Sequence, residues 1–144
     1  MALPARAWWA CVLGAPPVAL LVARLGYGLP IGDPWRDLGL LALYAALEEV
    51  VFRAGVQHAL SRIPALAIGR PMSGANGLAS VAFALAHLWA HPPLAALGTL
   101  PVSLLLGWAY ERSRERLLVP VLLHAYFNAA LYLVSFALAT RALG

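Results

Sequence analysis

The sequence predicts an all-α integral membrane protein, a bundle of about five transmembrane helices in one domain covering residues 1–144. Three observations predict this fold class. Apolar residues make up 62% of the 144 positions and charged residues only 11%, against about 45–50% and about 25% in soluble domains. The mean hydropathy is +0.80. Apolar stretches of roughly 20 residues, the length that a membrane helix needs, recur along the chain.

The same composition excludes several other classes of protein. The high hydrophobicity excludes a disordered chain, and the single Cys11 excludes a disulfide scaffold. The net charge of +4 comes from arginines alone, and these are dispersed along the chain instead of forming one basic face. We therefore expect no nucleic-acid partner, and the arginines fit better as signals of membrane topology.

Breaker residues and charged runs divide the chain into five apolar stretches. Pro16 and Pro17 predict a kink in the first, and a glycine- and proline-rich loop at 26–34 follows it. The second ends in a connector with arginine, proline and glycine. The third stops at a Pro-Pro pair, and the charged run 111–116 ends the fourth. The expected spans are 7–25, 36–58, 75–90, 94–110 and 117–140.

Five spans place the two termini on opposite sides of the membrane. Six arginines fall on one side, namely Arg6, Arg62, Arg70, Arg112, Arg114 and Arg116. Three fall on the other side, namely Arg24, Arg36 and Arg141. Because positively charged loops stay in the cytoplasm, this bias predicts a cytoplasmic N-terminus and a cytoplasmic loop at 112–116.

The second span contains three charged residues, Glu48, Glu49 and Arg53. At about 2.5–3.5 kcal/mol each, their insertion into lipid costs roughly 7–10 kcal/mol. The eight Leu, Val and Phe side chains between Asp37 and Phe52 contribute only about 2–5 kcal/mol in return. The helix is therefore expected to bury these charges against partner helices.

The spacing of these charges predicts two different environments for the two glutamates. Glu49 and Arg53 are four residues apart in the favourable acid-first order and can pair along one face. Glu48 is offset by about 100° on the helix, which leaves it available as a general base. A purely structural ion pair between helices is the alternative, but it leaves the second glutamate unexplained because packing gains nothing from another buried charge.

The third and fifth spans add imidazoles and an amide. His87 is either a hydrogen-bonded core histidine or a functional group, and with His91, four residues later, it could chelate a metal, although the prolines after His91 favour a helix end at the interface. His124 and Asn128 share a face, where two donors could stabilise an oxyanion or simply bond between helices. His58 has the position of an interfacial residue without an assigned role.

Together, these groups favour the activation of water. The chain has no serine or cysteine beside a base, no glycine-rich phosphate loop and no Cys/His cluster. It has a candidate base, a histidine that could orient water and a pair of oxyanion donors. Ionisable residues inside a membrane protein indicate a functional site by default. The fourth span is expected to serve packing, through Ser103 among others, with Gly98 and Gly107 as positions of close approach.

These residues resemble the three motifs of the CPBP family, the CAAX-type and bacteriocin-processing (Abi) intramembrane endopeptidases related to the Ras-converting CAAX endoprotease. In order, the motifs are Glu48-Glu49-x-x-x-Arg53, Phe83-x-x-x-His87 and His124-x-x-x-Asn128. Residues 107–113, which lead through Pro120 to the last motif, are also similar to the family. The resemblance covers about 41–131 and implies a compact member of the family.

The resemblance implies a helical bundle that hydrolyses peptide bonds through glutamate-activated water. Glu48 would be the general base, acting on a water that His87 also contacts. Glu49 would act through Arg53, and the pair in the last motif would form the oxyanion hole. It also implies a substrate that is a membrane protein or peptide, for example one with a C-terminal sorting tag. We expect the protein to lie in the lipid bilayer of a bacterial or archaeal cytoplasmic membrane. In a bacterium, prenylated CAAX substrates are not expected.

Two alternatives remain open at the level of sequence. The first is a zinc-dependent metalloprotease on the same fold, with ligands drawn from Glu48, Glu49, His87 and His124. We favour a mechanism without a cofactor, because Asn128 is a poor zinc ligand and a natural oxyanion donor. The second is a non-enzymatic proton relay or scaffold, since buried Glu and His residues also serve proton pathways. Against it, the sequence lacks the repeat symmetry of transporters.

Overall fold

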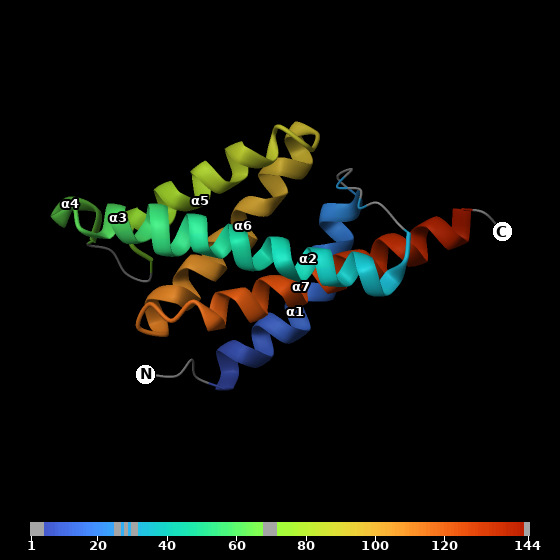
Figure 1. Cartoon of the computed structure of the whole chain (residues 1–144), viewed down its shortest axis with the longest axis horizontal. Helices are drawn as coiled ribbons and strands as arrows, with labels where there is room; N and C mark the ends of the chain where they lie inside the picture. Colours follow the sequence, from blue (N-terminus) through green and yellow to red (C-terminus); the bar gives the residue numbers. More distant parts are fainter. Residues whose placement is uncertain (1–4, 25–26, 28, 30–31, 68–71, 143–144) are drawn as a thin grey trace.

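The structure, a computed structural model, describes residues 5–24, 27, 29, 32–67 and 72–142. Every regular element within these ranges is helical, which confirms the predicted all-α class (Figure 1). In chain order the elements are α1 (Ala5–Arg24), α2 (Pro34–Glu49), the π-helix η1 (Val50–Gln57), α3 (His58–Ser61), α4 (Pro64–Ala67), α5 (Gly74–His87), α6 (Pro93–Arg112) and α7 (Leu118–Ala142).

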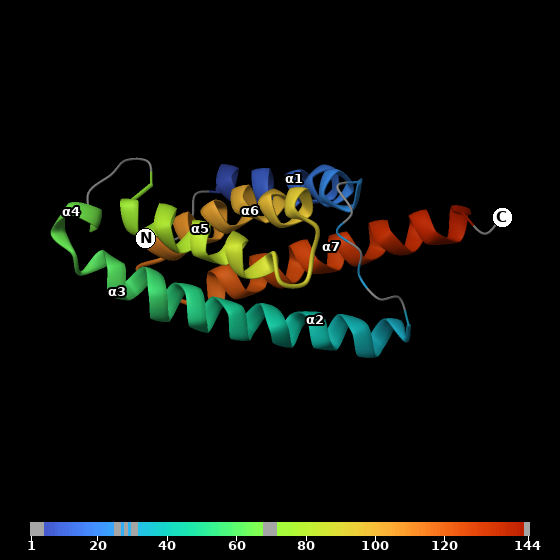
Figure 2. The ribbon, with the colours of Figure 1, turned by 90° about the horizontal axis from the view of Figure 1, so that it is seen from above.

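Helices α2, η1 and α3 form one uninterrupted helical rod from Pro34 to Ser61 (Figure 2). Asp33 begins it as an N-cap, since its carboxylate accepts hydrogen bonds from the backbone N–H groups of Trp35 (2.9 Å) and Arg36 (3.2 Å). The π-helical segment in the middle is not expected from the sequence. Such segments are rare and are frequently found at functional sites.

Helices α5 and α7 pack against different parts of this rod. Helix α7 lies against α2 and α1, whereas α5 lies against η1, α3 and α6. Seen from above, α7 extends further towards the start of α2 than α5 does (Figure 2). As a result, the last residue of α5, His87, and the second turn of α7, with His124, come near each other. The Phe83 ring bridges them, with its centroid 4.4 Å from that of His87 and 5.9 Å from that of His124.

Small residues allow α5 and α6 to approach closely. Ala75, Ala79, Ala95 and Ala96 are fully buried between helices. In membranes, where apolar packing against lipid gives no advantage, such small side chains favour close contact between backbones. This close contact brings polar groups of α6 within reach of η1.

Helices α6 and α7 are long and apolar enough to cross a membrane. Large apolar side chains also lie on the outside of other helices, such as Leu47 of α2 (53% exposed) and Leu85 of α5 (57% exposed). Exposed apolar side chains of this size suit contact with lipid. These features favour a membrane protein. Helices also lie over the other three expected spans, but their crossing of the bilayer stays a prediction.

Candidate active site

The predicted ion pair between Glu49 and Arg53 forms, and both side chains are fully buried. Arg53 Nε donates to Glu49 Oε2 at 3.0 Å. Its remaining nitrogens donate to Gln57 Oε1 (3.1 Å), to the carbonyl oxygen of Ser103 (2.9 Å) and to Ser103 Oγ (2.8 Å). The guanidinium is therefore held by η1 and α6 together, which fixes the orientation of the Glu49 carboxylate.

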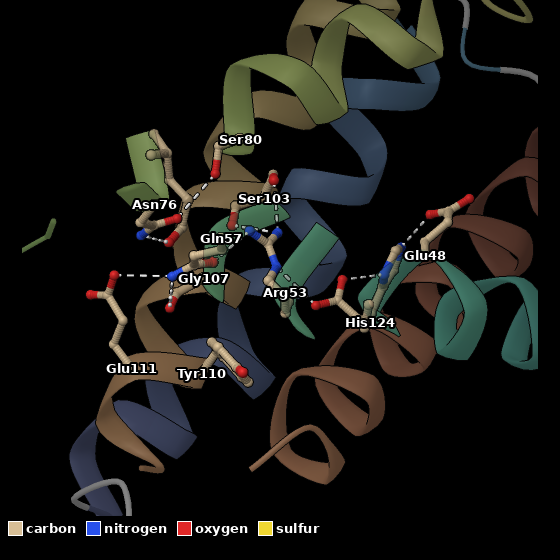
Figure 3. Close-up of polar contacts among 12 residues, drawn as sticks. Glu48, Arg53, Gln57, Asn76, Ser80, Ser103, Gly107, Tyr110, Glu111 and His124 are labelled. Carbon is tan, nitrogen blue, oxygen red and sulfur yellow. Dashed lines mark hydrogen bonds and ion pairs between the residues drawn. The ribbon is translucent and has the colours of Figure 1, made fainter. Parts of the chain in front are cut away.

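His124 lies between the two glutamates (Figure 3). Its Nδ1 is 2.9 Å from Glu49 Oε1, and its Nε2 is 3.6 Å from Glu48 Oε2. Because Glu49 is ion-paired with Arg53 and accepts hydrogen bonds, Nδ1 of His124 is the donor in this contact. Nδ1 therefore carries a proton, and the other ring nitrogen, Nε2, faces Glu48. In the neutral ring Nε2 is an acceptor, and in the imidazolium it is a donor.

The adjacent glutamates occupy different environments. The side chain of Glu49 is fully buried, whereas that of Glu48 is 35% exposed. Glu48 lines a cavity of about 520 Å³, and Glu49 does not. One carboxylate is thus part of the buried ion pair, and the other is accessible to a molecule in the cavity.

His87 presents a single ring nitrogen for interaction with other groups. Its Nδ1 lies 2.9 Å from the carbonyl oxygen of Phe83, one turn earlier in α5. A carbonyl oxygen can only accept, so Nδ1 carries the proton and the neutral ring keeps Nε2 as an acceptor. The ring of His87 lines the same cavity as Glu48.

The cavity brings together side chains from α2, α5 and α7. Glu48, His87, His124 and Asn128 all line it. Its other lining residues are Tyr27, Leu29, Asp37, Leu40, Leu41, Tyr44, Phe52, Ala86, Ala90 and His91. Four of the six residues singled out in the sequence therefore share one cavity, while Glu49 and Arg53 lie behind it and support it.

The amide of Asn128 has a hydrogen-bond partner that the sequence does not predict. Asn128 Nδ2 donates to the carbonyl oxygen of Leu41 at 3.3 Å. An amide nitrogen has two N–H donors, and this contact uses one of them. Both side chains line the cavity, and their action as a pair of oxyanion donors stays a prediction.

The four residues considered above as zinc ligands, Glu48, Glu49, His87 and His124, are not arranged as a metal site. Within the described ranges, no group of three or more His, Cys, Asp or Glu side chains could hold a metal ion. Glu49 bonds to Arg53 and His124. His91, the other half of the possible chelating pair, stacks on Tyr27 with ring centroids 3.7 Å apart. We derive no chemical step through a metal.

A buried polar network next to Arg53 was missed by the sequence analysis. Gln57, only 2% exposed, donates to the carbonyl oxygen of Gly107 (3.1 Å) and to Glu111 Oε1 (3.0 Å). Asn76 is fully buried and donates to the carbonyl oxygen of Leu104 at 3.0 Å. The spacing could have revealed Gln57, because residues 49, 53 and 57 follow one another at intervals of four.

The network corrects the expected role of the fourth span. Ser103, expected to serve packing, is fully buried and accepts two hydrogen bonds from Arg53, one at its carbonyl oxygen and one at its hydroxyl oxygen. Gly107 is the position of close approach that the sequence predicts. A Cβ there would lie 1.9 Å from Asn76 Oδ1 and 2.8 Å from Gln57 Oε1.

The fold and the site define a helical membrane protein in which a glutamate and two histidines line one cavity. The chain matches the family described as type II CAAX prenyl endopeptidase Rce1-like over residues 30–130. It therefore belongs to the Rce1-like family, and this confirms the resemblance to CAAX-type proteases, with all three motifs inside the matched region. No curated protein and no solved structure matches the chain.

Proposed function

We propose that the protein is an intramembrane endopeptidase, which hydrolyses a peptide bond of a membrane-anchored or membrane-tagged protein. The observation that carries this proposal is the convergence of Glu48, His87, His124 and Asn128 on one cavity. Membership of a family of endopeptidases supports it. A structural role for these polar groups would not require an open cavity beside the ion pair.

Glu48 is the general base in this proposal. Its carboxylate takes a proton from a water molecule while the water oxygen forms a bond to the carbonyl carbon of the substrate. The unprotonated Nε2 of His87 accepts a hydrogen bond from the other O–H of the water and orients it, and no proton moves to His87. When the tetrahedral intermediate collapses, the C–N bond breaks and Glu48 passes its proton to the leaving nitrogen. The products are one carboxyl and one amine terminus.

His124 and Asn128 stabilise the oxyanion. As an imidazolium, His124 donates from Nε2 into the cavity, and the buried Glu49 carboxylate at its Nδ1 compensates the charge. The second N–H of the Asn128 amide supplies the other donor. Arg53 is a positioning residue here, because it contacts Glu49 and does not line the cavity.

The substrate segment is apolar in this proposal. Leu29, Leu40, Leu41 and Phe52 make up much of the cavity wall, and an apolar lining selects an apolar segment. A membrane-spanning helix or a C-terminal sorting tag, unwound at the bond to be cleaved, fits this chemistry. The location that we propose is the cytoplasmic membrane of a bacterium or archaeon.

The decisive variant is Glu48→Gln, which keeps the size of the side chain and removes the base. We expect cleavage to fall by about 10²–10⁴-fold, with unchanged insertion and thermal stability. The readout is a comparison of new N-termini in membrane proteins from cells producing either form. Glu115→Gln, an exposed glutamate in the turn after α6, is the matched control and should cleave normally. Normal cleavage by Glu48→Gln would exclude Glu48 as the base.

A further inference from the structure

The contact between Arg53 and Glu49 uses one nitrogen of the guanidinium and one oxygen of the carboxylate. Arg53 Nε donates to Glu49 Oε2 at 3.0 Å, whereas Glu49 Oε1 accepts from His124 Nδ1 at 2.9 Å. Pairs of guanidinium and carboxylate groups are frequently bidentate, with two parallel hydrogen bonds. Here the second bond would join Nη2 of Arg53 to Oε1 of Glu49, the oxygen that His124 uses. Another group therefore has to hold Nη2 away from this oxygen.

Ser103 of α6 provides both partners of this nitrogen. Nη2 carries two N–H donors, and Ser103 offers an acceptor for each, its carbonyl oxygen at 2.9 Å and its Oγ at 2.8 Å (Figure 3). Because Ser103 is fully buried, these hydrogen bonds form in surroundings of low dielectric, where they are strong. The carbonyl oxygen alone would leave one N–H of Nη2 free for Glu49. The Ser103 hydroxyl therefore decides whether Arg53 can pair with both carboxylate oxygens.

Gln57 holds the other terminal nitrogen of the guanidinium, Nη1. Its Oε1 accepts from Nη1 at 3.1 Å. The orientation of this amide is fixed, because its Nε2 donates to the carbonyl oxygen of Gly107 at 3.1 Å, which can only accept, and to Glu111 Oε1 at 3.0 Å. The guanidinium is thus held at both terminal nitrogens, and only Nε is left for Glu49.

We propose that Ser103 and Gln57 are positioning residues for the catalytic histidine. By holding the terminal nitrogens of Arg53, they restrict it to one oxygen of Glu49 and reserve the other oxygen for His124. Neither is among the described residues that line the cavity, so both act through Arg53 and Glu49 and touch no substrate. The consequence for catalysis rests on the proposed function, in which Glu49 compensates the charge of the imidazolium. The division of the carboxylate can be tested without activity.

Ser80 allows this role to be separated from a purely structural one, in which the network only joins helices. Like Ser103, Ser80 is fully buried, and its hydroxyl donates to Asn76 Oδ1 at 3.1 Å in the same network. It has no hydrogen bond to Arg53 among the described residues. A structural role predicts that Ser103→Ala and Ser80→Ala affect the protein alike. The positioning role predicts that only Ser103→Ala alters the contact of His124.

The first measurement follows the Nδ1–H proton of His124 by NMR, in detergent-solubilised protein that carries isotope-labelled histidine. Its signal is assigned by its loss in His124→Gln, and it lies downfield while the proton is bonded to a carboxylate. In Ser103→Ala, one N–H of Nη2 is free to compete for Glu49 Oε1, so we expect the signal to move upfield. Gln57→Met, which frees Nη1, should move it in the same direction. Ser80→Ala should leave it in place.

An unmoved His124 signal in folded Ser103→Ala would overturn the proposal, because Arg53 would then not compete for the second oxygen. An equal shift in Ser80→Ala would also overturn it, since the signal would then report a general loosening of the helices. Should Ser103→Ala fail to fold, Ser103→Cys carries the same comparison. It keeps the shape of the side chain and replaces the hydroxyl oxygen by sulfur, a weaker acceptor.

The second measurement is the rate of cleavage of a substrate found by the comparison of N-termini. Loss of the bond between His124 and the buried carboxylate should lower kcat of Ser103→Ala by about 10–100-fold. KM should change little, because Ser103 is not among the described residues that line the cavity. Full kcat in a variant whose His124 signal has moved would overturn the positioning role. Should the unsubstituted protein cleave nothing while the signal moves as expected, the proposed function fails and the division of the Glu49 carboxylate stands.

Discussion

At the scale of single residues, the central feature is the opposite use of two neighbouring glutamates. Glu49 is locked between Arg53 and His124, and Glu48 faces the cavity. The sequence predicted the pairing of Glu49 with Arg53, because four-residue spacing places them on one helical face. It could not predict that His124 bridges the glutamates, since these residues are 75 positions apart and no local pattern encodes a contact between helices.

Removal of the Arg53 cation should destabilise the protein strongly. Arg53→Met leaves the Glu49 carboxylate buried without its partner, and breaking a buried ion pair costs about 3–5 kcal/mol. The free energy of unfolding can be measured in mixed micelles with increasing denaturing detergent. Arg36→Met, an arginine with an exposed side chain on α2, should change it by less than about 0.5 kcal/mol. Equal stability of the two variants would contradict the central role of the pair.

Arg53→Lys separates charge from geometry. Lysine keeps the positive charge but cannot donate to Glu49, Gln57 and Ser103 in the fixed fork of a guanidinium. We expect kcat to fall more than KM changes, because the Glu49 carboxylate would no longer hold His124 at the cavity. Full activity of this variant would show that charge alone is sufficient.

At the scale of elements, the close contact of α5, α6 and η1 depends on Gly107. A Cβ at this position would meet Asn76 and Gln57 at distances that real structures do not show. We expect Gly107→Ala to destabilise the protein by about 1–3 kcal/mol through overpacking and the loss of network hydrogen bonds.

Gly39 provides the control, because a Cβ there meets no atom within 4 Å. Gly39→Ala, in the middle of α2, should be neutral or stabilise the helix by about 0.5–1 kcal/mol. Thermal melting of the two variants in the same detergent makes the comparison. A neutral Gly107→Ala would mean that α6 can move away from η1 at little cost.

The order and type of the elements followed from the sequence more completely than their fine geometry. Apolar runs and proline breaks predicted helices at the positions where they occur, because helix length and breaker chemistry are local properties. The π-segment and the polar network were not predicted. The network depends on the packing of η1 against α6, in which Arg53 and Gln57 find partners 50 residues away.

At the scale of the whole molecule, the proposal of metal-independent chemistry can be checked on purified protein. Within the part of the chain that the structure describes, no group of three or more His, Cys, Asp or Glu side chains is placed to hold a metal ion. We expect less than about 0.1 zinc ion per chain in active preparations, and no loss of cleavage after treatment with a chelator. Stoichiometric zinc, with activity that disappears on chelation and returns with metal, would overturn this proposal.

The π-helical segment η1 affects which faces of the rod the residues before and after it occupy. In η1 the N–H of His58 bonds to the carbonyl oxygen of Arg53, five residues earlier, where an α-helix would use the fourth. The wide turn therefore accommodates about one residue more than an α-helix would over the same stretch. If the present residues wound as a regular α-helix, the two halves of the rod would be rotated against each other by about 100°. Glu48 and Gln57 would then no longer face the cavity and α6 at the same time, so the width of this turn matters to the site as much as the identity of its charged residues.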